Sequence, residues 1–277
     1  MKEKIILIVT LFLCFSYPLA AQGNLLIFPK RIVFEGVQNR VKTINLSNIG
    51  KDTATYKLSY NQIRMGIDGS FNPIKVPELD QNFASPNLRF YPRRITLAPN
   101  ESQTVKIQLI NTNKLKQGEY RSHLYFRGVP KVTLLKKEDL NMNAQKTKKM
   151  RVNLVPVFGL SIANIITIGE NTTKVQLTNL KVDLAEDKST ILSLDFNRQG
   201  NQSAYGNIEV NYISTEGLKQ KVALIKGFAI YSPGKLRQSK IALDNRPQID
   251  YSKGELQVSF TSLDPLILYA KANLTLN

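Results

Sequence analysis

Few residues in this chain are of types that carry out chemistry. Its 277 residues include one histidine, His123, one cysteine, Cys14, and no tryptophan. His123 lies in the segment EYRSHLYF, where strand alternation places it with Tyr125 on one side and Ser122 and Leu124 on the other. A catalytic histidine needs an oriented nucleophile or acid, and the sequence has no motif for one, no G-x-S-x-G elbow and no Gly-rich phosphate loop. We therefore predict a structural histidine and no enzyme activity.

A metal or cofactor site is equally hard to build from this composition. With a single histidine and a single cysteine, a metal site would need oxygen ligands alone. The acidic pair Glu138 and Asp139, in EDLN, lacks the ligand spacing of a calcium-binding loop. The sequence predicts no metal and no cofactor.

The N-terminus has the pattern of an export signal. Two lysines precede an apolar run over residues 5–15, and small residues ending in Ala21 follow it. This pattern is typical of a secretory signal peptide over residues 1–21, cleaved after Ala21. An uncleaved membrane anchor is the alternative, although the run is short for a membrane span. Cleavage would remove the one cysteine, so we expect an exported mature chain without disulfides.

The rest of the chain is patterned as β-strands. Ile, Val, Thr, Tyr and Phe recur in short alternating runs, separated by Gly, Pro and Asn at intervals that suit a sandwich. We find no amphipathic helix and no fixed-period repeat. The pattern predicts an all-β chain of two antiparallel sandwiches in series, over residues 22–163 and 164–277. The strands expected are KTINLSNI, ATYKLSY, QTVKIQLI and RSHLYF in the first domain, and KVQLTNL, TILSLDF, NIEVNYI, KVALIKGFAIY, ELQVSF and LILYAKANLTL in the second.

Positive charge is concentrated in the first domain. Residues 22–163 hold 23 lysines and arginines against 9 aspartates and glutamates, whereas residues 164–277 hold 13 against 11. Part of this charge lies in a Lys- and Asn-rich stretch over residues 131–151, which is either a solvated mobile loop or one that orders when a partner binds. The aromatic residues are not interleaved with the lysines as a nucleic-acid groove requires, so we predict no nucleic-acid partner.

The segment MRVNLVPVFGLSIANII, residues 150–166, combines strand alternation with a proline in its middle. Proline has no N–H to donate to a ladder, so the pattern predicts an edge strand rather than a central one. A long apolar edge strand invites pairing with other chains. We expect Val155 and Val157 to cover the domain's own interior. The other, apolar face consists of Met150, Val152, Leu154, Pro156, Phe158, Leu160 and Ile162.

Five segments, in order along the chain, point to one family. They are FPKRIVFEG (28–36), LRFYPRRITLAPNESQTVKIQL (88–109), GEYRSHLYF (118–126), GLSIANII (159–166) and LDFNRQGNQSAYGNIEV (194–210). Together they resemble the PapD-like periplasmic chaperones of fimbrial and related surface subunits, in the branch near spore-coat and archaic-type systems. Each segment also has a purely structural explanation, such as a turn at Pro92 or Pro99, chain freedom at Gly118 or a corner tyrosine at Tyr120.

The resemblance implies a periplasmic chaperone of two immunoglobulin-like domains set at an angle, like a boomerang. In that family the last strand of the first domain is lent to an incomplete immunoglobulin-like pilus or fimbrial subunit, which is donor-strand complementation. The alternative is that this strand belongs only to the core of its own domain. The resemblance leaves open whether an outer-membrane usher is a partner and whether the free protein caps itself as a homodimer. Carried over to this chain, the donated side chains are Met150, Val152, Leu154, Pro156, Phe158 and Leu160.

The resemblance also implies an anchor for the terminal carboxylate of the client subunit. The family places an Arg on the first strand and a Lys on the last strand of the first domain, and Arg31 matches the Arg. The Lys position falls near Ala163, and residues 150–173 contain no lysine. Lys30, another cation of the cleft or backbone N–H groups would then assist Arg31. The plain alternative is that Arg31 pairs with Glu35 on the surface.

A protein of a different class fits the same edge strand. A structural or adhesion component of a surface complex would keep such a strand permanently paired. A chaperone raises the yield of its subunit yet is absent from the finished polymer, and this difference separates the two hypotheses.

Overall fold

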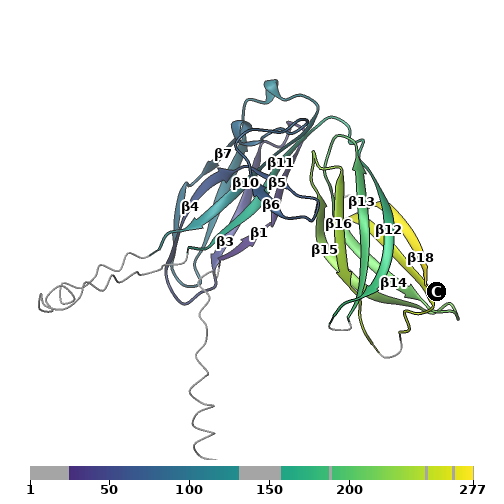
Figure 1. Ribbon diagram of the computed structural model, residues 1–277. Coiled ribbons are helices and arrows are strands. Elements are labelled where there is room, and N and C mark those ends of the chain that lie inside the picture. The colour runs from purple at the N-terminus through teal and green to yellow at the C-terminus, as the bar shows by residue number, and fades with distance from the viewer. Residues whose placement is uncertain (1–24, 131–156, 187–188, 247–248, 264–265, 277) are drawn as a thin grey trace, which may run out of the picture.

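The structure is a computed structural model of the chain, and it describes residues 25–130, 157–186, 189–246, 249–263 and 266–276. In these ranges the chain forms strands and two short 3₁₀ helices, η1 (Ser85–Asn87) and η2 (Thr112–Lys114), and no α-helix. The strands build two β-sandwiches that meet at one end and diverge at the other (Figure 1). The prediction of an all-β fold with two sandwich domains at an angle is confirmed.

The first sandwich packs a four-stranded sheet against a five-stranded sheet. The four-stranded sheet has the order β1 (Leu25–Phe28), β3 (Val41–Asn48), β9 (Ser102–Leu109), β7 (Leu88–Tyr91). The five-stranded sheet has the order β2 (Arg31–Glu35), β11 (Gly159–Ile168), β10 (Gly118–Gly128), β4 (Ala54–Asn61), β8 (Arg94–Leu97).

Strand alternation builds the core of this sandwich. In β3, Ile44 and Leu46 are fully buried while the residues between and before them are more exposed. Phe34 and Phe126 are the largest fully buried side chains in the same core. Tyr120 is a corner tyrosine, because its hydroxyl accepts a hydrogen bond of 2.8 Å from the Lys116 N–H four residues upstream.

The chain changes sheets between its first two strands. β1 pairs antiparallel with β3, whereas β2 pairs with β11 in parallel, Arg31 lying opposite Ala163. The sequence predicts antiparallel pairing only, and this one parallel pair is a departure from it. Alternation within a strand carries no information on the direction of a partner more than 100 residues away.

The second sandwich packs a three-stranded sheet against a four-stranded sheet. Phe196, Phe228 and Phe260 form an aromatic group inside it, with ring centroids 4.6 to 5.8 Å apart. The strand orders are β12 (Lys174–Leu184), β13 (Thr190–Gln199), β16 (Leu236–Ala242) and, in the other sheet, β15 (Lys219–Ile230), β14 (Ala204–Ile213), β17 (Gly254–Leu263), β18 (Leu266–Leu276).

Two elements of the first sandwich reach the second. The hairpin of β5 (Ile63–Met65) and β6 (Phe71–Pro73) extends to β16, where the Gln238 N–H donates a 2.7 Å hydrogen bond to the Ile67 carbonyl.

β11 runs on to Ile168, so the expected division between residues 163 and 164 falls inside a strand of the first sandwich. We therefore place the boundary after Ile168.

Candidate functional site

Only part of β11 is paired on both sides. β10 pairs with it along its whole length, from Gly159 opposite Arg127 to Ile168 opposite Gly118. β2 pairs only with residues 163–167. Within the described ranges no strand pairs with the other side of residues 159–162, so the backbone there is an open sheet edge. Within the described part of the predicted strand, residues 159–162 form a sheet edge and residues 163–166 are central.

Two large apolar side chains are exposed at this open half. Phe158 is 54% exposed and Leu160 is 44% exposed. They lie on the face that continues as Ile162 and Ile166, which are both buried in the core of the first sandwich. One face of the chain therefore changes environment along β11. It is exposed to solvent at Phe158 and Leu160, and it is buried in the core from Ile162 onward.

The prediction that Val157 covers the interior of the domain is wrong. Val157 is 40% exposed, and the even-numbered face fills the core instead, at Ile162 and Ile166. One pleat register runs through the whole strand, so the face predicted for a partner is also the face that packs inward. Five residues of the predicted strand, Met150, Val152, Leu154, Val155 and Pro156, lie outside the described residues.

Arg31 lies at the junction of the two sandwiches. Its guanidinium carbon is 4.0 Å from the centroid of the Tyr205 ring, in the second domain. Its Nε atom is buried and has no hydrogen-bond partner among the described residues. No ion pair joins Arg31 to Glu35 there. Arg31 therefore stacks on a tyrosine of the second domain, and its Nε–H has no acceptor among the described residues. This arrangement differs from the surface ion pair with Glu35 that was the alternative.

The missing lysine position is the direct neighbour of Arg31. Ala163 pairs with Arg31 on one side and with His123 on the other. On the same face of β10, two residues before His123, is the buried cation Arg121. Strand alternation in GEYRSHLYF also places Arg121 on this face, where the sequence prediction named only His123 and Tyr125.

Only part of the hydrogen-bonding capacity of the Arg121 guanidinium is used. Its Nη2 donates a 2.9 Å hydrogen bond to the Ser232 carbonyl, and its guanidinium carbon lies 4.2 Å from the Tyr231 ring centroid. Its Nε and Nη1 are buried without hydrogen-bond partners in the described structure. Burial lowers the pKa of Arg121, and the neighbouring carboxylate of Glu119 opposes that effect. Buried guanidinium N–H groups without acceptors favour the binding of an anion such as a carboxylate.

The carboxylate of Glu119 accepts hydrogen bonds from a residue of the second domain. One carboxylate oxygen accepts a 2.6 Å hydrogen bond from the Ser203 N–H, and the other accepts a 2.5 Å bond from the Ser203 hydroxyl. Its distance to the Arg121 Nε is 3.9 Å, which is long for an ion pair. The buried cation Arg121 therefore has as its neighbour a carboxylate whose lone pairs are largely used by Ser203.

His123 is packed as an aromatic side chain. Its ring centroid lies 5.8 Å from that of Phe71 and 6.1 Å from that of Tyr231. Burial and the positive charge of Arg121 lower the pKa of His123 to about 3, so the imidazole is neutral at ordinary pH. It contributes shape and polarity to the junction and no charge.

Other kinds of site are not found in the described ranges. No group of three or more His, Cys, Asp and Glu side chains gathers there as metal ligands. None of the helices described is long and apolar enough to cross a membrane. The arrangement combines an open strand edge with unsatisfied cations at its far end, which suits the binding of an extended peptide with a carboxylate.

Comparisons with known proteins find similarity in structure alone. No family model matches the chain, and no curated protein matches it. The similar solved structures include chaperones and chaperone–subunit complexes, two of them from fimbriae. The YadV chaperone is 12% identical, with 92% of this chain and 100% of that one aligned and a TM-score of 0.44. The CupB2 chaperone of Pseudomonas aeruginosa is 11% identical over 91% and 100%, with a TM-score of 0.43.

A third similar structure is a complex. It is the CsuC–CsuE chaperone and tip adhesion subunit pre-assembly complex from archaic chaperone-usher Csu pili of Acinetobacter baumannii. The alignment is 12% identical over 92% of this chain and 98% of that one, with a TM-score of 0.42. An identity of 7 to 15% among the similar structures does not transfer function, so a function for this chain has to rest on its own residues.

Proposed function

We propose that this protein is an exported, noncatalytic chaperone that caps an incomplete immunoglobulin-like subunit of a surface polymer by strand addition. The observation that carries the proposal is the open half of β11, residues 159–162, with Phe158 and Leu160 exposed beside it. In strand addition the backbone hydrogen bonds provide affinity, and alternate side chains fill successive pockets of the client. The β11 edge offers both.

The donated face in this proposal is the alternating one predicted from the sequence. Phe158 and Leu160 are its described members, and Met150, Val152, Leu154 and Pro156 continue it toward the N-terminus. Ile162 ends the donated part, because it is buried in the core of the chaperone itself.

Arg31 and Arg121 are the proposed anchor for the client's C-terminal carboxylate. Both have buried donor nitrogens without partners in the described structure, and each stacks on a tyrosine of the second domain, Arg31 on Tyr205 and Arg121 on Tyr231. Charge-assisted hydrogen bonds from guanidinium to carboxylate are among the strongest available to a protein. In this scheme Arg121 takes the role of the lysine that is absent at Ala163.

The cellular setting of the proposal follows from the leader and the open edge. Residues 1–21 direct the chain to the periplasm and are removed. An open strand edge attracts a second copy of the same chain, so we infer that the free protein caps itself as a homodimer until a client arrives. An outer-membrane usher would then receive the chaperone and subunit complex.

Co-purification from the periplasm tests the proposal. The full-length gene is expressed with candidate surface subunits, and the subunit recovered with the tagged chaperone is quantified. Phe158→Asp and Leu160→Asp should reduce recovery at least tenfold, because each places an unpaired charge in an apolar client pocket. Leu218→Asp, at another exposed leucine, is the matched control and should retain wild-type recovery.

Three outcomes decide the matter. Loss of the subunit with both strand variants and retention with the control support the proposal. Unchanged recovery with both strand variants overturns it. Stoichiometric chaperone in the finished surface polymer would instead identify a permanent structural component.

A further inference from the structure

A row of three cations crosses the outer face of the five-stranded sheet. Lys57 on β4 is the direct cross-strand partner of Arg127 on β10 and of Arg94 on β8. All three side chains are exposed, and none forms an ion pair within the part of the chain that the structure describes. Like charges directly opposite one another destabilise a sheet. The row is therefore a local cost to the fold that an anionic partner would relieve.

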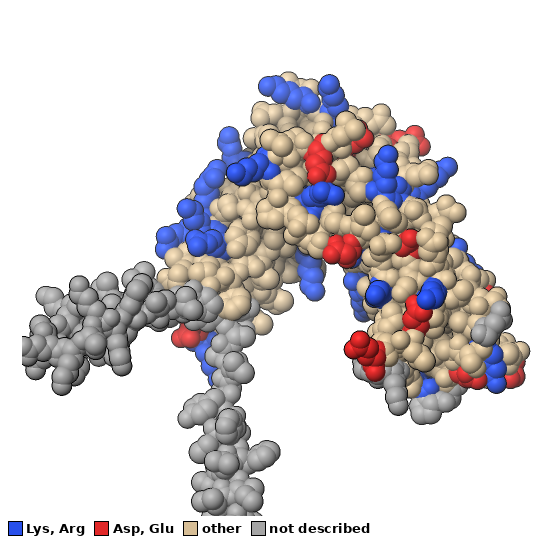
Figure 2. Space-filling model, in the orientation of Figure 1, with Lys and Arg blue, Asp and Glu red and all other residues tan. Residues whose placement is uncertain are grey.

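The surface around this row is basic. Figure 2 shows lysines and arginines gathered over the side of the first sandwich where Figure 1 places β4 and β7, with no acidic side chain among them in that view. Arg89 and Arg93 add two more exposed cations next to the row, again without an ion pair in the described structure. The charge excess seen in the sequence of the first domain is thus partly concentrated on one face.

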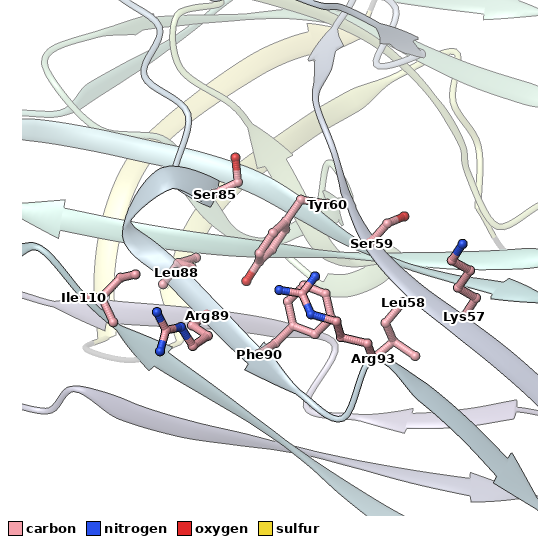
Figure 3. Close-up of a pocket in the computed structure, with 10 residues that line it drawn as sticks. All are labelled: Lys57, Leu58, Ser59, Tyr60, Ser85, Leu88, Arg89, Phe90, Arg93 and Ile110. Carbon is pink, nitrogen blue, oxygen red and sulfur yellow. The ribbon is translucent and has the colours of Figure 1, made fainter.

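An apolar pocket opens beside these cations. It has a volume of about 400 Å³ and lies between β4 of one sheet and β7 of the other (Figure 3). Leu58, Leu88 and Phe90 line it and are themselves buried core residues, so the pocket is closed at its base. Tyr60 stands edge-on to Phe90, with the ring centroids 5.2 Å apart.

The rim of the pocket is cationic. Lys57, Arg89 and Arg93 all line it, and the Arg93 guanidinium lies 5.2 Å from the Phe90 ring centroid (Figure 3). No aspartate or glutamate lines the pocket. The same site therefore combines an apolar pocket with three cationic side chains at its rim.

We propose that this face binds an acidic segment of a partner protein, which inserts one large apolar side chain in the pocket. The volume is at the small end of the range of roughly 300 to 1,000 Å³ typical of ligand pockets, and its closed base suits one side chain better than an acyl chain. The cations lie on paired strands about 4.8 Å apart, and same-face carboxylates of an extended peptide are about 6.6 Å apart, a difference that long lysine and arginine side chains can span. Charge complementarity selects the acidic partner.

The site goes beyond the proposed chaperone function and does not depend on it. In the five-stranded sheet β4 is two strands from β11, and β2 lies on the far side of β11. A peptide in the pocket would therefore leave the open edge of β11 free. The cation row does reach the start of β11, since Arg127 pairs with Gly159. An acidic partner could thus be held while the strand edge is occupied.

Fluorescence anisotropy with a defined probe tests the proposal. The probe is a labelled ten-residue peptide of Asp and Glu with one central Phe, titrated with the full mature chain at low salt. The double variant Lys57→Gln/Arg94→Gln should bind at least tenfold more weakly. Its melting temperature should not fall, because the substitutions remove like-charge repulsion. Lys51→Gln/Lys116→Gln, which removes two exposed lysines elsewhere on the same domain, should change binding less than twofold.

Two further arms identify the partner class. A probe with Ala in place of Phe should bind at least fivefold more weakly if the pocket is used, and equal binding overturns the pocket assignment. Vesicles of phosphatidylglycerol form the second arm. Sensitivity to Lys57 and Arg94 in vesicle binding, with no peptide binding, overturns the acidic-peptide proposal in favour of a membrane. Equal loss in both double variants also overturns it, because the effect is then net charge alone.

Discussion

His123 makes the stability of this protein depend on pH through its neutral form. In an unfolded chain a histidine has a pKa near 6.5, whereas burial and Arg121 lower the pKa of His123 to about 3. Between these values the unfolded chain binds more protons than the folded one. The stabilisation is therefore complete above about pH 6.5 and is lost as the pH falls toward 3.

A urea titration at two pH values tests this role. From pH 7 to pH 5 the histidine should remove about 2 kcal/mol from the free energy of unfolding. His123→Gln should have a pH dependence that is smaller by that amount, since glutamine does not titrate. Identical pH dependence of the unfolding free energy in the two proteins would show that folding does not lower the pKa of His123.

Arg31 is predicted to matter for client binding more than for stability. Arg31→Ala should lower subunit recovery at least tenfold, and Arg31→Lys should fall between the two, because lysine cannot grip a carboxylate at two points. The stacking on Tyr205 that is lost with the guanidinium contributes about 0.5–1 kcal/mol to folding. Arg40→Ala, at an exposed arginine of the same domain, is the control.

The client itself supplies the decisive comparison for Arg31. A subunit with an amidated C-terminus should bind the wild-type and Arg31→Ala proteins equally. If the amidated subunit still discriminates between them, Arg31 does not hold the carboxylate.

Strand β11 is predicted to have two energetically different halves. Ile166→Ala removes a side chain that is fully buried and should cost about 2–5 kcal/mol of unfolding free energy. Phe158→Ala and Leu160→Ala remove half-exposed side chains and should each cost less than about 1 kcal/mol. Urea unfolding of the isolated protein measures all three. A large cost at Phe158 or Leu160 would place those side chains in the protein's own core.

The sequence was sufficient to find the long strands but not the end of the core on β11. Phe158, Leu160 and Ile162 are all large and apolar, and nothing in their alternation marks where burial begins. That point is set by the pairing of β2, which reaches only to Ala163 from a segment more than 100 residues earlier. Short or polar strands were also missed: β5 and β6 have three residues each, and LRQSKIA in β16 has one fully buried side chain, Ile241.

At the scale of the whole molecule, a few polar contacts couple the two sandwiches. Glu119 accepts two hydrogen bonds from Ser203, Arg121 donates to Ser232, and the hairpin at Ile67 accepts from Gln238. A small apolar cluster of Ala163, Ile165, Ala229 and Tyr231 lies between them. None of these pairings was predictable, because they join residues distant in sequence whose types are common in any strand.

Calorimetry tests this coupling. Glu119→Ala removes the acceptor of both Ser203 hydrogen bonds and the only carboxylate next to Arg121 in the described structure, which should cost about 1–3 kcal/mol for each buried group left without a partner. We expect a lower melting temperature and a separation into two transitions, one for each sandwich. Glu78→Gln, which removes an exposed pair with Arg64, should change stability by less than about 1 kcal/mol. A single unshifted transition for Glu119→Ala would show that the junction does not couple the domains.

Amide hydrogen exchange along β11, with and without a bound subunit, tests the central claim most directly. Residues 163–167 are paired on both sides in the free protein, whereas residues 159–162 are paired only with β10. The account predicts that amides of residues 159–162 that do not donate to β10 exchange at least tenfold more slowly in the complex, while residues 163–167 change little. Unchanged exchange at residues 159–162 in a stable complex would contradict it, because the subunit would then be held elsewhere.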